Sequence, residues 1–215
     1  MHFAHISNVC QFQDELDQNI RLPVKPLRKP RIMRCRAICF TILALPFSLA
    51  SVPAENMPSD RLGEYDVKAA FIYNFARFIE WTPWHKNGEN PFFSIGVLGE
   101  EPFGNALDDT FTDKTIAGSH VRIMRAGNLQ ALMDCQILFI SQSEQSRVDK
   151  ILNALNDRQI LTIADFPGFA EAGGIIELRV EENRVRFLIN QKTAVDAGLK
   201  ISSKLLNLAQ KVITR

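Results

Sequence analysis

An uninterrupted apolar run, Ile137-Leu-Phe-Ile140, is the feature that most restricts the fold of this chain. A strand with one solvated face alternates polar and apolar residues, whereas a parallel strand covered on both faces does not. The segment from Gln136 to Ile140 therefore predicts a central strand with helices above and below it. Further buried strands are expected at 92–98 and 160–164.

Helical patterns alternate with these strands. Phe71, Phe75 and Phe78 recur at helical spacing within a predicted helix over 62–81, and a second helix is expected over 143–156. The remaining predicted elements are a short helix at 102–109, a strand at 121–124, a helical turn at 129–133, a loop at 168–174 and a long C-terminal helix at 191–213. This alternation predicts an α/β fold, in which helices cover both faces of a mostly parallel sheet.

An antiparallel hairpin is expected near the C-terminus. Two strands at 175–181 and 184–189 are joined by the two residues Glu182 and Asn183, which is hairpin spacing. One face of this hairpin is apolar, and the other mixes charge with an apolar residue. The mixed face consists of Ile175, Glu177, Arg179, Glu181, Arg184 and Arg186. We interpret the mixed face either as a solvated surface or as a docking site for a protein partner.

The first 54 residues differ in composition from the rest of the chain. A basic cluster at 28–36 precedes an apolar run from Ala37 to Ala50, and small residues follow the run. This order is typical of a cleaved secretory signal peptide. The run is about 14 residues long and contains Pro46. A spanning helix needs about 20 residues, so an uncleaved anchor is the weaker alternative.

The position of this signal is unusual. It lies far from Met1, and Met33 is a better placed start. Residues 1–32 are then either an over-extension of the reading frame or an unstructured leader. In both cases we expect a mature periplasmic protein that begins near Ser51 or Glu55, and N-terminal sequencing of periplasmic material tests this.

The 161 residues that follow the leader suffice for one domain with a sizeable core. We expect a linker over 55–61 and a single domain over 62–215. The domain carries 18 Lys and Arg residues against 21 Asp and Glu residues, a net charge of −3. A slightly acidic domain without basic runs argues against nucleic acid as a partner, because phosphate binding needs clustered cations.

Cysteine usage is equally restrictive. Cys10, Cys35 and Cys39 lie in the leader, so Cys135 has no partner within the mature domain. Cys135 opens an apolar segment, and we expect its thiol to be buried and reduced.

No motif predicts a cofactor or a metal. The segment from Gly99 to Gly104 follows a strand and precedes a helix, but it lacks dinucleotide-binding spacing, and Glu100 and Glu101 would repel phosphate. His85 and His120 each stand alone, without the pairing that a zinc site requires.

A catalytic constellation is not evident either. Ser141 and Ser143 follow one predicted strand and Asp165 ends another, at the edge where α/β sites form, but neither serine has an obvious base nearby. We therefore expect a protein that is not an enzyme, and an exported hydrolase that uses Ser141 or Asp165 remains a third hypothesis.

The end of the first helix offers a second candidate surface. Its aromatic segment runs from Tyr73 to Trp81, and Trp84 follows. The alternatives are core packing and a partner-binding surface at Trp81 and Trp84.

Four segments together resemble a known family. They are Tyr65-Asp-Val-Lys-Ala-Ala-Phe-Ile-Tyr-Asn-Phe-Ala-Arg-Phe-Ile-Glu-Trp81, Val97-Leu-Gly with Pro102-Phe-Gly104, Gly168-Phe-Ala with Gly173-Gly-Ile-Ile-Glu-Leu178, and Arg186-Phe-Leu-Ile-Asn190 with Gly198-Leu-Lys-Ile-Ser-Ser-Lys-Leu-Leu206. In this order they are similar to the YfiR-like family of periplasmic proteins, over about 62–213.

The resemblance implies a regulator without catalysis. Members of such a family repress a membrane-bound diguanylate cyclase by contacting its periplasmic part, and an outer-membrane lipoprotein relieves the repression by sequestering them. Cyclic di-GMP and biofilm matrix then rise. A homodimer is also implied. Relatives often carry disulfide-forming cysteines, but this chain has Gly96 where a partner for Cys135 is expected, so redox control by an intrachain disulfide is in doubt.

The leading hypothesis is therefore a periplasmic repressor in cyclic di-GMP signalling. The alternative is a periplasmic sensor that binds a small ligand, because aromatic residues near the carboxyl edge of a sheet can line a pocket.

Overall fold

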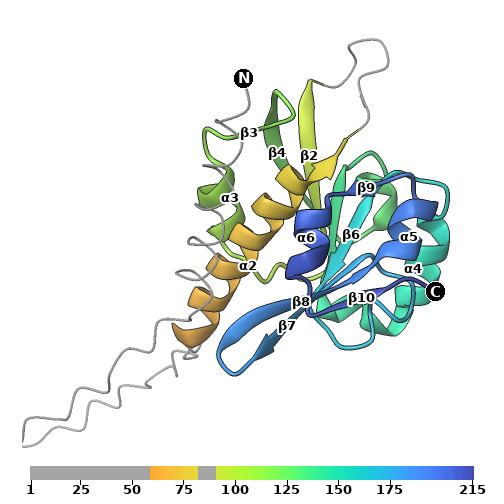
Figure 1. Ribbon diagram of the computed structural model, residues 1–215. Coiled ribbons are helices and arrows are strands. Elements are labelled where there is room, and N and C mark those ends of the chain that lie inside the picture. Colours follow the sequence, from red (N-terminus) through yellow and green to blue (C-terminus); the bar gives the residue numbers. More distant parts are fainter. Residues whose placement is uncertain (1–58, 82–90) are drawn as a thin grey trace, which may run out of the picture.

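The computed structural model describes residues 59–81 and 91–215, which form a curled sheet with helices on both of its faces (Figure 1). The predicted leader and linker up to residue 58, together with His85 and Trp84, lie outside the described residues. The helices are α2 (Ser59–Phe78), α3 (Ala106–Phe111), η1 (Leu129–Leu132), η2 (Gln142–Arg147), α4 (Val148–Leu155), α5 (Gln191–Asp196) and α6 (Ser203–Leu208). The strands are β1 (Ile79–Glu80), β2 (Phe92–Leu98), β3 (Thr115–Ile116), β4 (Ser119–Ala126), β5 (Ile137–Ile140), β6 (Leu161–Ala164), β7 (Ile176–Glu181), β8 (Arg184–Asn190), β9 (Lys200–Ile201) and β10 (Lys211–Ile213).

Eight of these strands form one sheet in the order β10-β8-β7-β6-β5-β2-β4-β3. The strands β4, β2, β5, β6 and β7 run parallel to one another, as does β10 to β8. The pairs β7–β8 and β3–β4 are antiparallel. The prediction of a mostly parallel sheet is therefore corrected to a mixed sheet, because a short hairpin sits at one edge and a longer one within the sheet.

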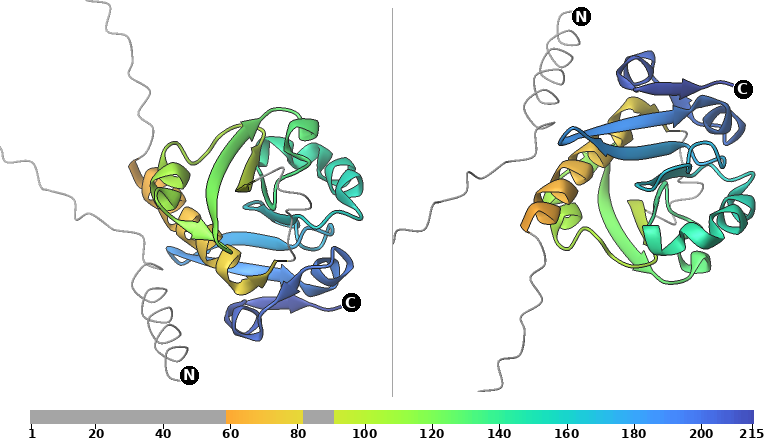
Figure 2. Two further views of the ribbon diagram at one scale, coloured as in Figure 1. Left: turned by 90° about the horizontal axis from the view of Figure 1, so that it is seen from above. Right: turned by 90° about the horizontal axis from the view of Figure 1, so that it is seen from below.

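The core is divided between the two faces of the sheet (Figure 2). The larger cluster contains the apolar side of α2 with α3 and α6, and Phe71, Ile72 and Phe75 are all buried there. The smaller cluster contains η1 and α4 on the opposite face. The central run Ile137–Ile140 is buried at every position, which confirms the prediction of a strand covered on both faces.

The predicted long C-terminal helix is wrong. Helix α5 ends at Asp196, and Gly198 follows with a φ of 71°, a left-handed conformation that favours glycine and commonly ends helices. Helix α6 begins anew after Ser202, whose hydroxyl accepts a hydrogen bond from the Leu205 amide. The apolar spacing continues through both breaks, so periodicity alone suggested one helix.

The first helix also ends earlier than predicted. The chain leaves α2 at Phe78, and Ile79 and Glu80 pair antiparallel with Ile201 and Lys200 of β9. This two-stranded sheet ties the end of α2 to the C-terminal segment, and it explains why the helix stops before Pro83.

Candidate interaction site

The hairpin of β7 and β8 projects from the sheet at the lower edge of Figure 1. Glu182 and Asn183 have φ values of 50° and 59°. Positive φ at both central residues is the signature of the two-residue type I′ turn, whose twist matches that of the strands. The turn and its two strands were therefore predicted correctly.

One face of the hairpin packs on α2. The cross-strand pair Leu178 and Phe187 lies on this face. The Phe187 ring lies 5.8 Å from the Phe71 ring and 5.1 Å from the Phe75 ring, in both cases edge to face. These contacts fix the hairpin to the core and direct its other face away from α2.

The base of the other face is covered, which corrects part of the predicted surface. Ile175 and Glu177 are only 1% and 0% exposed, although alternation placed them on the outward side. Ile175 ends the loop between β6 and β7, and Ala170 of the same loop is bonded to Glu177. The Ala170 amide donates to Oε2 of Glu177 at 3.0 Å, and Nε of Arg179 donates to Oε1 at 2.5 Å.

Buried hydrogen bonds thus hold this loop in place. The Asn190 side chain donates to the Ala170 carbonyl at 2.8 Å, so the Ala170 peptide is bound on both sides. A Cβ on Gly174 would lie 2.1 Å from the Phe169 ring, so only glycine permits this approach. The segment Gly168 to Leu178 therefore encodes a rigid loop as well as a strand.

The distal part of the outward face remains accessible. Arg179 opposes Arg186 across the strands, and Glu181 opposes Arg184. All four are half-buried, whereas Val180, which is 41% exposed, lies on the opposite face of the hairpin together with Leu178 and Val185. Because Ile175 is covered, the accessible part of this face consists of charged residues and lacks the apolar residue that the sequence placed on it.

The charged side chains on this distal face differ in whether they have a bonding partner. The hydrogen bond to Glu177 raises the pKa of Arg179 and holds its guanidinium. The side chain of Gln210 donates to Glu181 at 2.6 Å. Arg184 and Arg186 have no ion pair in the part of the chain that the structure describes. Like charges directly opposite each other are unfavourable, and the ion pair of Arg179 with Glu177 offsets part of the repulsion between Arg179 and Arg186.

The second predicted surface is occupied by internal contacts. The indole N–H of Trp81 donates to the Ala76 carbonyl at 2.7 Å, and its ring lies 5.0 Å from the Phe93 ring. Trp81 is therefore tied to the core, as the packing alternative predicted. Trp84 lies outside the described residues.

The carboxyl edge of the parallel strands holds an ionic cluster that sequence reasoning missed. Nζ of Lys68 lies 2.6 Å from Oδ2 of Asp165, and the Tyr65 hydroxyl donates to the same oxygen at 2.8 Å. Glu64 also contacts the Lys68 ammonium. Lys68 lies on the apolar stripe of α2, four residues before Ile72, and a lysine at such a position signals a buried ion pair.

This edge provides no evident catalytic base. The carboxylate of Asp165 is engaged by Lys68 and Tyr65. The hydroxyl of Ser143 accepts from the Glu100 amide at 3.0 Å, and the buried Ser141 hydroxyl has no partner among the described residues. Neither serine is therefore activated as a nucleophile in the arrangement that a hydrolase needs.

Side chains of α2, η2 and the loop after β2 contact one another or the backbone at the same edge. The Tyr65 ring lies 5.2 Å from the Phe103 ring, edge to face. Ser143 and Glu144 pack closely on Gly99, so that a Cβ there would lie 2.5 Å from the Ser143 hydroxyl. Tyr65 and Phe103, two aromatic residues at this edge, are thus packed against each other. Within 59–81 and 91–215, no three side chains of the metal-binding types come together.

Cys135 is buried, as predicted, and is free. Burial raises the pKa of its thiol to about 11. Gly96 of the neighbouring strand lies directly against it, since a Cβ on Gly96 would lie 3.0 Å from Sγ of Cys135. The glycine therefore stands where a second cysteine would reach the first.

The fold and this surface define an α/β domain that offers a charged, projecting hairpin and no assembled reaction centre among its described residues. The chain belongs to the YfiR/HmsC-like family, whose model matches residues 65–210. This is a family of periplasmic regulators that act through a partner protein. None of the helices within the described ranges is long and apolar enough to cross a membrane.

No curated protein matches the sequence. Among solved structures, the chain is similar to a conserved domain protein from Vibrio cholerae O1 biovar El Tor strain N16961, with a TM-score of 0.49 and 14% identity over 69% of this chain and 60% of that one. It is also similar to an ABC domain in complex with L-Trp from Streptococcus pneumonia, with a TM-score of 0.42 and 13% identity over 56% and 55% of the two chains. The chain spans less than two thirds of either structure, and neither likeness bears on its function.

Proposed function

We propose that this protein acts in the periplasm and represses a membrane-bound diguanylate cyclase by contacting the cyclase's periplasmic part. Membership of the YfiR/HmsC-like family supports a regulator that works through a protein partner. Repression of the cyclase lowers cyclic di-GMP and with it the formation of biofilm matrix. Sequestration by an outer-membrane lipoprotein and formation of a homodimer are further parts of this proposal.

The observation that carries the choice of surface is the presence of two arginines at the distal hairpin that have no ion pair among the described residues. Arg184 and Arg186 have no ion pair in the described part of the chain, and Arg186 faces Arg179 across the strands. Arginines that have no ion pair of their own among the described residues suit a partner surface that presents carboxylates, which steer the encounter and then pair with them.

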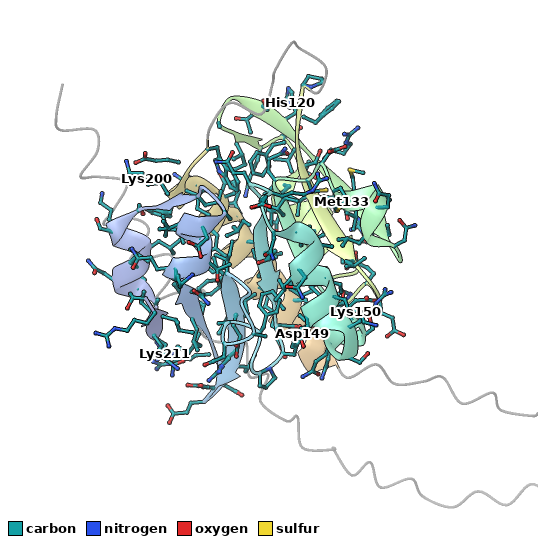
Figure 3. The ribbon with its side chains drawn as sticks, turned by 90° about the vertical axis from the view of Figure 1, so that its right-hand side faces the viewer. His120, Met133, Asp149, Lys150, Lys200 and Lys211 are labelled. Atoms are coloured by element: carbon teal, nitrogen blue, oxygen red, sulfur yellow. The ribbon has the colours of Figure 1, made fainter. Side chains whose placement is uncertain are left out.

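Charge reversal at the hairpin tests this proposal. Arg184→Glu and Arg186→Glu are expected to melt nearly like the native protein, because these half-buried side chains make no ion pair among the described residues and surface substitutions usually change stability by about 0.5 kcal/mol or less. Both are expected to weaken repression and raise cyclic di-GMP in cells that carry a cyclic di-GMP reporter. Lys150→Glu is the matched control, since it reverses one exposed charge on α4 (Figure 3).

Capture of the solubilised cyclase by the purified protein gives a second readout. Weaker capture by Arg184→Glu, with full capture by Lys150→Glu, supports the hairpin as the docking site. If both hairpin variants fold, capture the cyclase and repress it fully, the interface lies elsewhere.

A further inference from the structure

Strand β4 lies beyond β2 at one edge of the sheet, and most of its outer side has no neighbouring strand among the described residues (Figure 1). The short strand β3 pairs only with Ser119 and His120, at the start of β4. Residues 121–126 pair with β2 on their inner side, and no described strand adjoins their outer side. A free strand edge presents unpaired backbone groups that can bind another extended chain.

The register shows which backbone groups face outward. The Ala126 carbonyl accepts a hydrogen bond from the Gly99 amide, which follows β2, so the backbone groups of Ala126 face β2. Consecutive residues of a strand direct their N–H and C=O groups to opposite sides, so those of Val121, Ile123 and Arg125 face the free edge. Within 59–81 and 91–215, none of these three residues has a backbone hydrogen bond on that side.

The charged side chains of β4 do not protect this edge, although charge is a common protection of edge strands. The Arg125 guanidinium pairs with Glu101 at 2.5 Å and with Asp108, so its charge is compensated within the molecule. The guanidinium carbon of Arg122 lies 5.1 Å from the centre of the Phe92 ring, on the neighbouring inner strand. Both arginines are thus held by their own molecule.

The ends of the free stretch determine where a second copy of β4 fits. A copy related by a two-fold axis lies antiparallel, and β3 blocks it beside Ser119 and His120. An axis at Ile123 or earlier would place the end of the second strand where β3 lies. An axis at Arg125 would set two arginines directly opposite each other, which is unfavourable, and a later axis leaves a shorter ladder. An axis at Met124 meets both conditions.

The ladder around this axis is self-complementary. Ile123 of each copy lies opposite Arg125 of the other, and each of these pairs exchanges two backbone hydrogen bonds. Met124 lies opposite its own copy, at the closer spacing of about 4.5 Å between Cα atoms that a non-hydrogen-bonded pair has. Met124 is half-buried, so this contact removes further apolar surface from water. Arg122 lies opposite Ala126, and no arginine lies directly opposite another.

We propose that two copies of this protein pair through β4 in this register and extend the sheet across a two-fold axis at Met124. The inference rests on the homodimer that forms part of the proposed function, and it names the surface. Strands β2, β5 and β6 separate β4 from the hairpin of β7 and β8. Pairing through β4 therefore leaves the hairpin of each copy free to contact the cyclase.

Cysteine crosslinking tests the register. In a Cys135→Ala background, Met124→Cys places two thiols opposite each other, and a Cα separation of about 4.5 Å is within the range that a disulfide spans. We expect mild oxidation to give a covalent dimer on a non-reducing gel. Arg122→Cys is the control on the same strand and face, because its two copies would lie about 14 Å apart along the strand and should not crosslink.

Light scattering during size-exclusion chromatography tests the dimer without a crosslink. We expect the mature protein to have twice the mass of one chain. Met124→Lys should have the mass of one chain, because two ammonium groups would then oppose each other. Met133→Lys is the matched control and should stay dimeric, because Met133 is also half-buried on the same face of the sheet but lies outside β4 (Figure 3). Thermal melting shows that both variants fold.

The outcomes separate this surface from the rest of the proposed function. A dimer that persists in folded Met124→Lys protein and that Met124→Cys does not crosslink would overturn the β4 surface alone, and crosslinking of Arg122→Cys in its place would overturn the register. A monomeric native protein would overturn both this inference and the homodimer. If that monomer loses capture of the solubilised cyclase in Met124→Lys, the edge binds the cyclase and not a second copy. Repression by the hairpin variants is measured separately, so its failure is distinguishable.

Discussion

The ammonium of Lys68 and the carboxylate of Asp165 lie 2.6 Å apart, although 97 residues separate them in the chain. Their side chains are only 4% and 6% exposed. The pair joins the first half of α2 to the end of β6, where the loop between β6 and β7 begins. A buried ion pair contributes little compared with an apolar pair, but the loss of one partner leaves a charge without compensation.

Lys68→Met is therefore expected to lower the free energy of unfolding by about 3–5 kcal/mol, because Asp165 then keeps only the Tyr65 hydroxyl as a partner. Urea denaturation measures the loss. The double variant Lys68→Met with Asp165→Asn removes both charges and should recover part of it. If Lys68→Met unfolds at the native midpoint, the pair does not constrain the fold.

The core side of α2 gives a second prediction. Phe75 is 1% exposed, and its ring lies 5.8 Å from Phe71 and 5.1 Å from Phe187. Phe75→Ala should leave a cavity and lower the free energy of unfolding by about 3–5 kcal/mol. Phe92→Ala is the comparison, since Phe92 is 37% exposed and should cost far less. Equal melting temperatures for the two variants would contradict the assignment of Phe75 to the core.

The sequence predicts those parts of the fold that depend on local residue patterns, and it does not predict contacts between distant segments. The strand at Ile137–Ile140 and the turn at Glu182 and Asn183 follow from local signals, namely continuous apolarity and hairpin spacing. The burial of Glu177 does not, because alternation shows which residues share a face and not which loop covers that face.

The C-terminal segment shows the same limit. The helix predicted over 191–213 continues across Gly198 and Ser202 only if the caps are ignored. The pairing of β10 with β8 depends on a partner strand distant from it in the chain. Likewise, the site residue Lys68 was visible as a charge on an apolar stripe, but Asp165 as its partner required the fold. Local chemistry therefore predicted the elements better than their contacts.

Cys135 provides a prediction about pH. Burial raises the pKa of its thiol to about 11, so the thiol keeps its proton at neutral pH and is a poor nucleophile. Labelling of the native protein by a thiol-specific reagent should be slow at pH 7 and should accelerate as the pH rises toward that value. The unfolded protein, with a thiol pKa of about 8.5, should react much faster at pH 8. Rapid labelling of the native protein at pH 7 would contradict the burial.

The raised thiol pKa also affects stability, and its sign follows from proton binding. Between the unfolded and the folded pKa of Cys135, the folded protein retains a proton that the unfolded chain has lost. The contribution of this thiol to stability is therefore complete below the unfolded pKa and is lost as the pH rises toward about 11. Cys135→Ala should lack this part of the alkaline decline, which denaturation at pH 8 and pH 10 can measure.

The relation between Gly96 and Cys135 gives the last prediction. A Cβ on Gly96 would lie 3.0 Å from Sγ of Cys135. In a disulfide, the C–S and S–S bond lengths place the Cβ of one cysteine about 3 Å from the sulfur of the other. The same Cβ would lie 3.1 Å from Leu138 and 3.2 Å from Leu132, so these side chains must shift by a few tenths of an ångström.

Gly96→Cys is therefore expected to form a disulfide with Cys135 when the protein is exported to an oxidising compartment. Denatured protein should then show no free thiol, and reduction should release two. The crosslink should stabilise the domain by about 2–4 kcal/mol, less the cost of the tight contacts. Gly96→Ala isolates that cost, because it adds the Cβ without the sulfur, and should melt below the native protein. Two free thiols in oxidised, folded Gly96→Cys protein would mean that the strands hold the sulfurs apart.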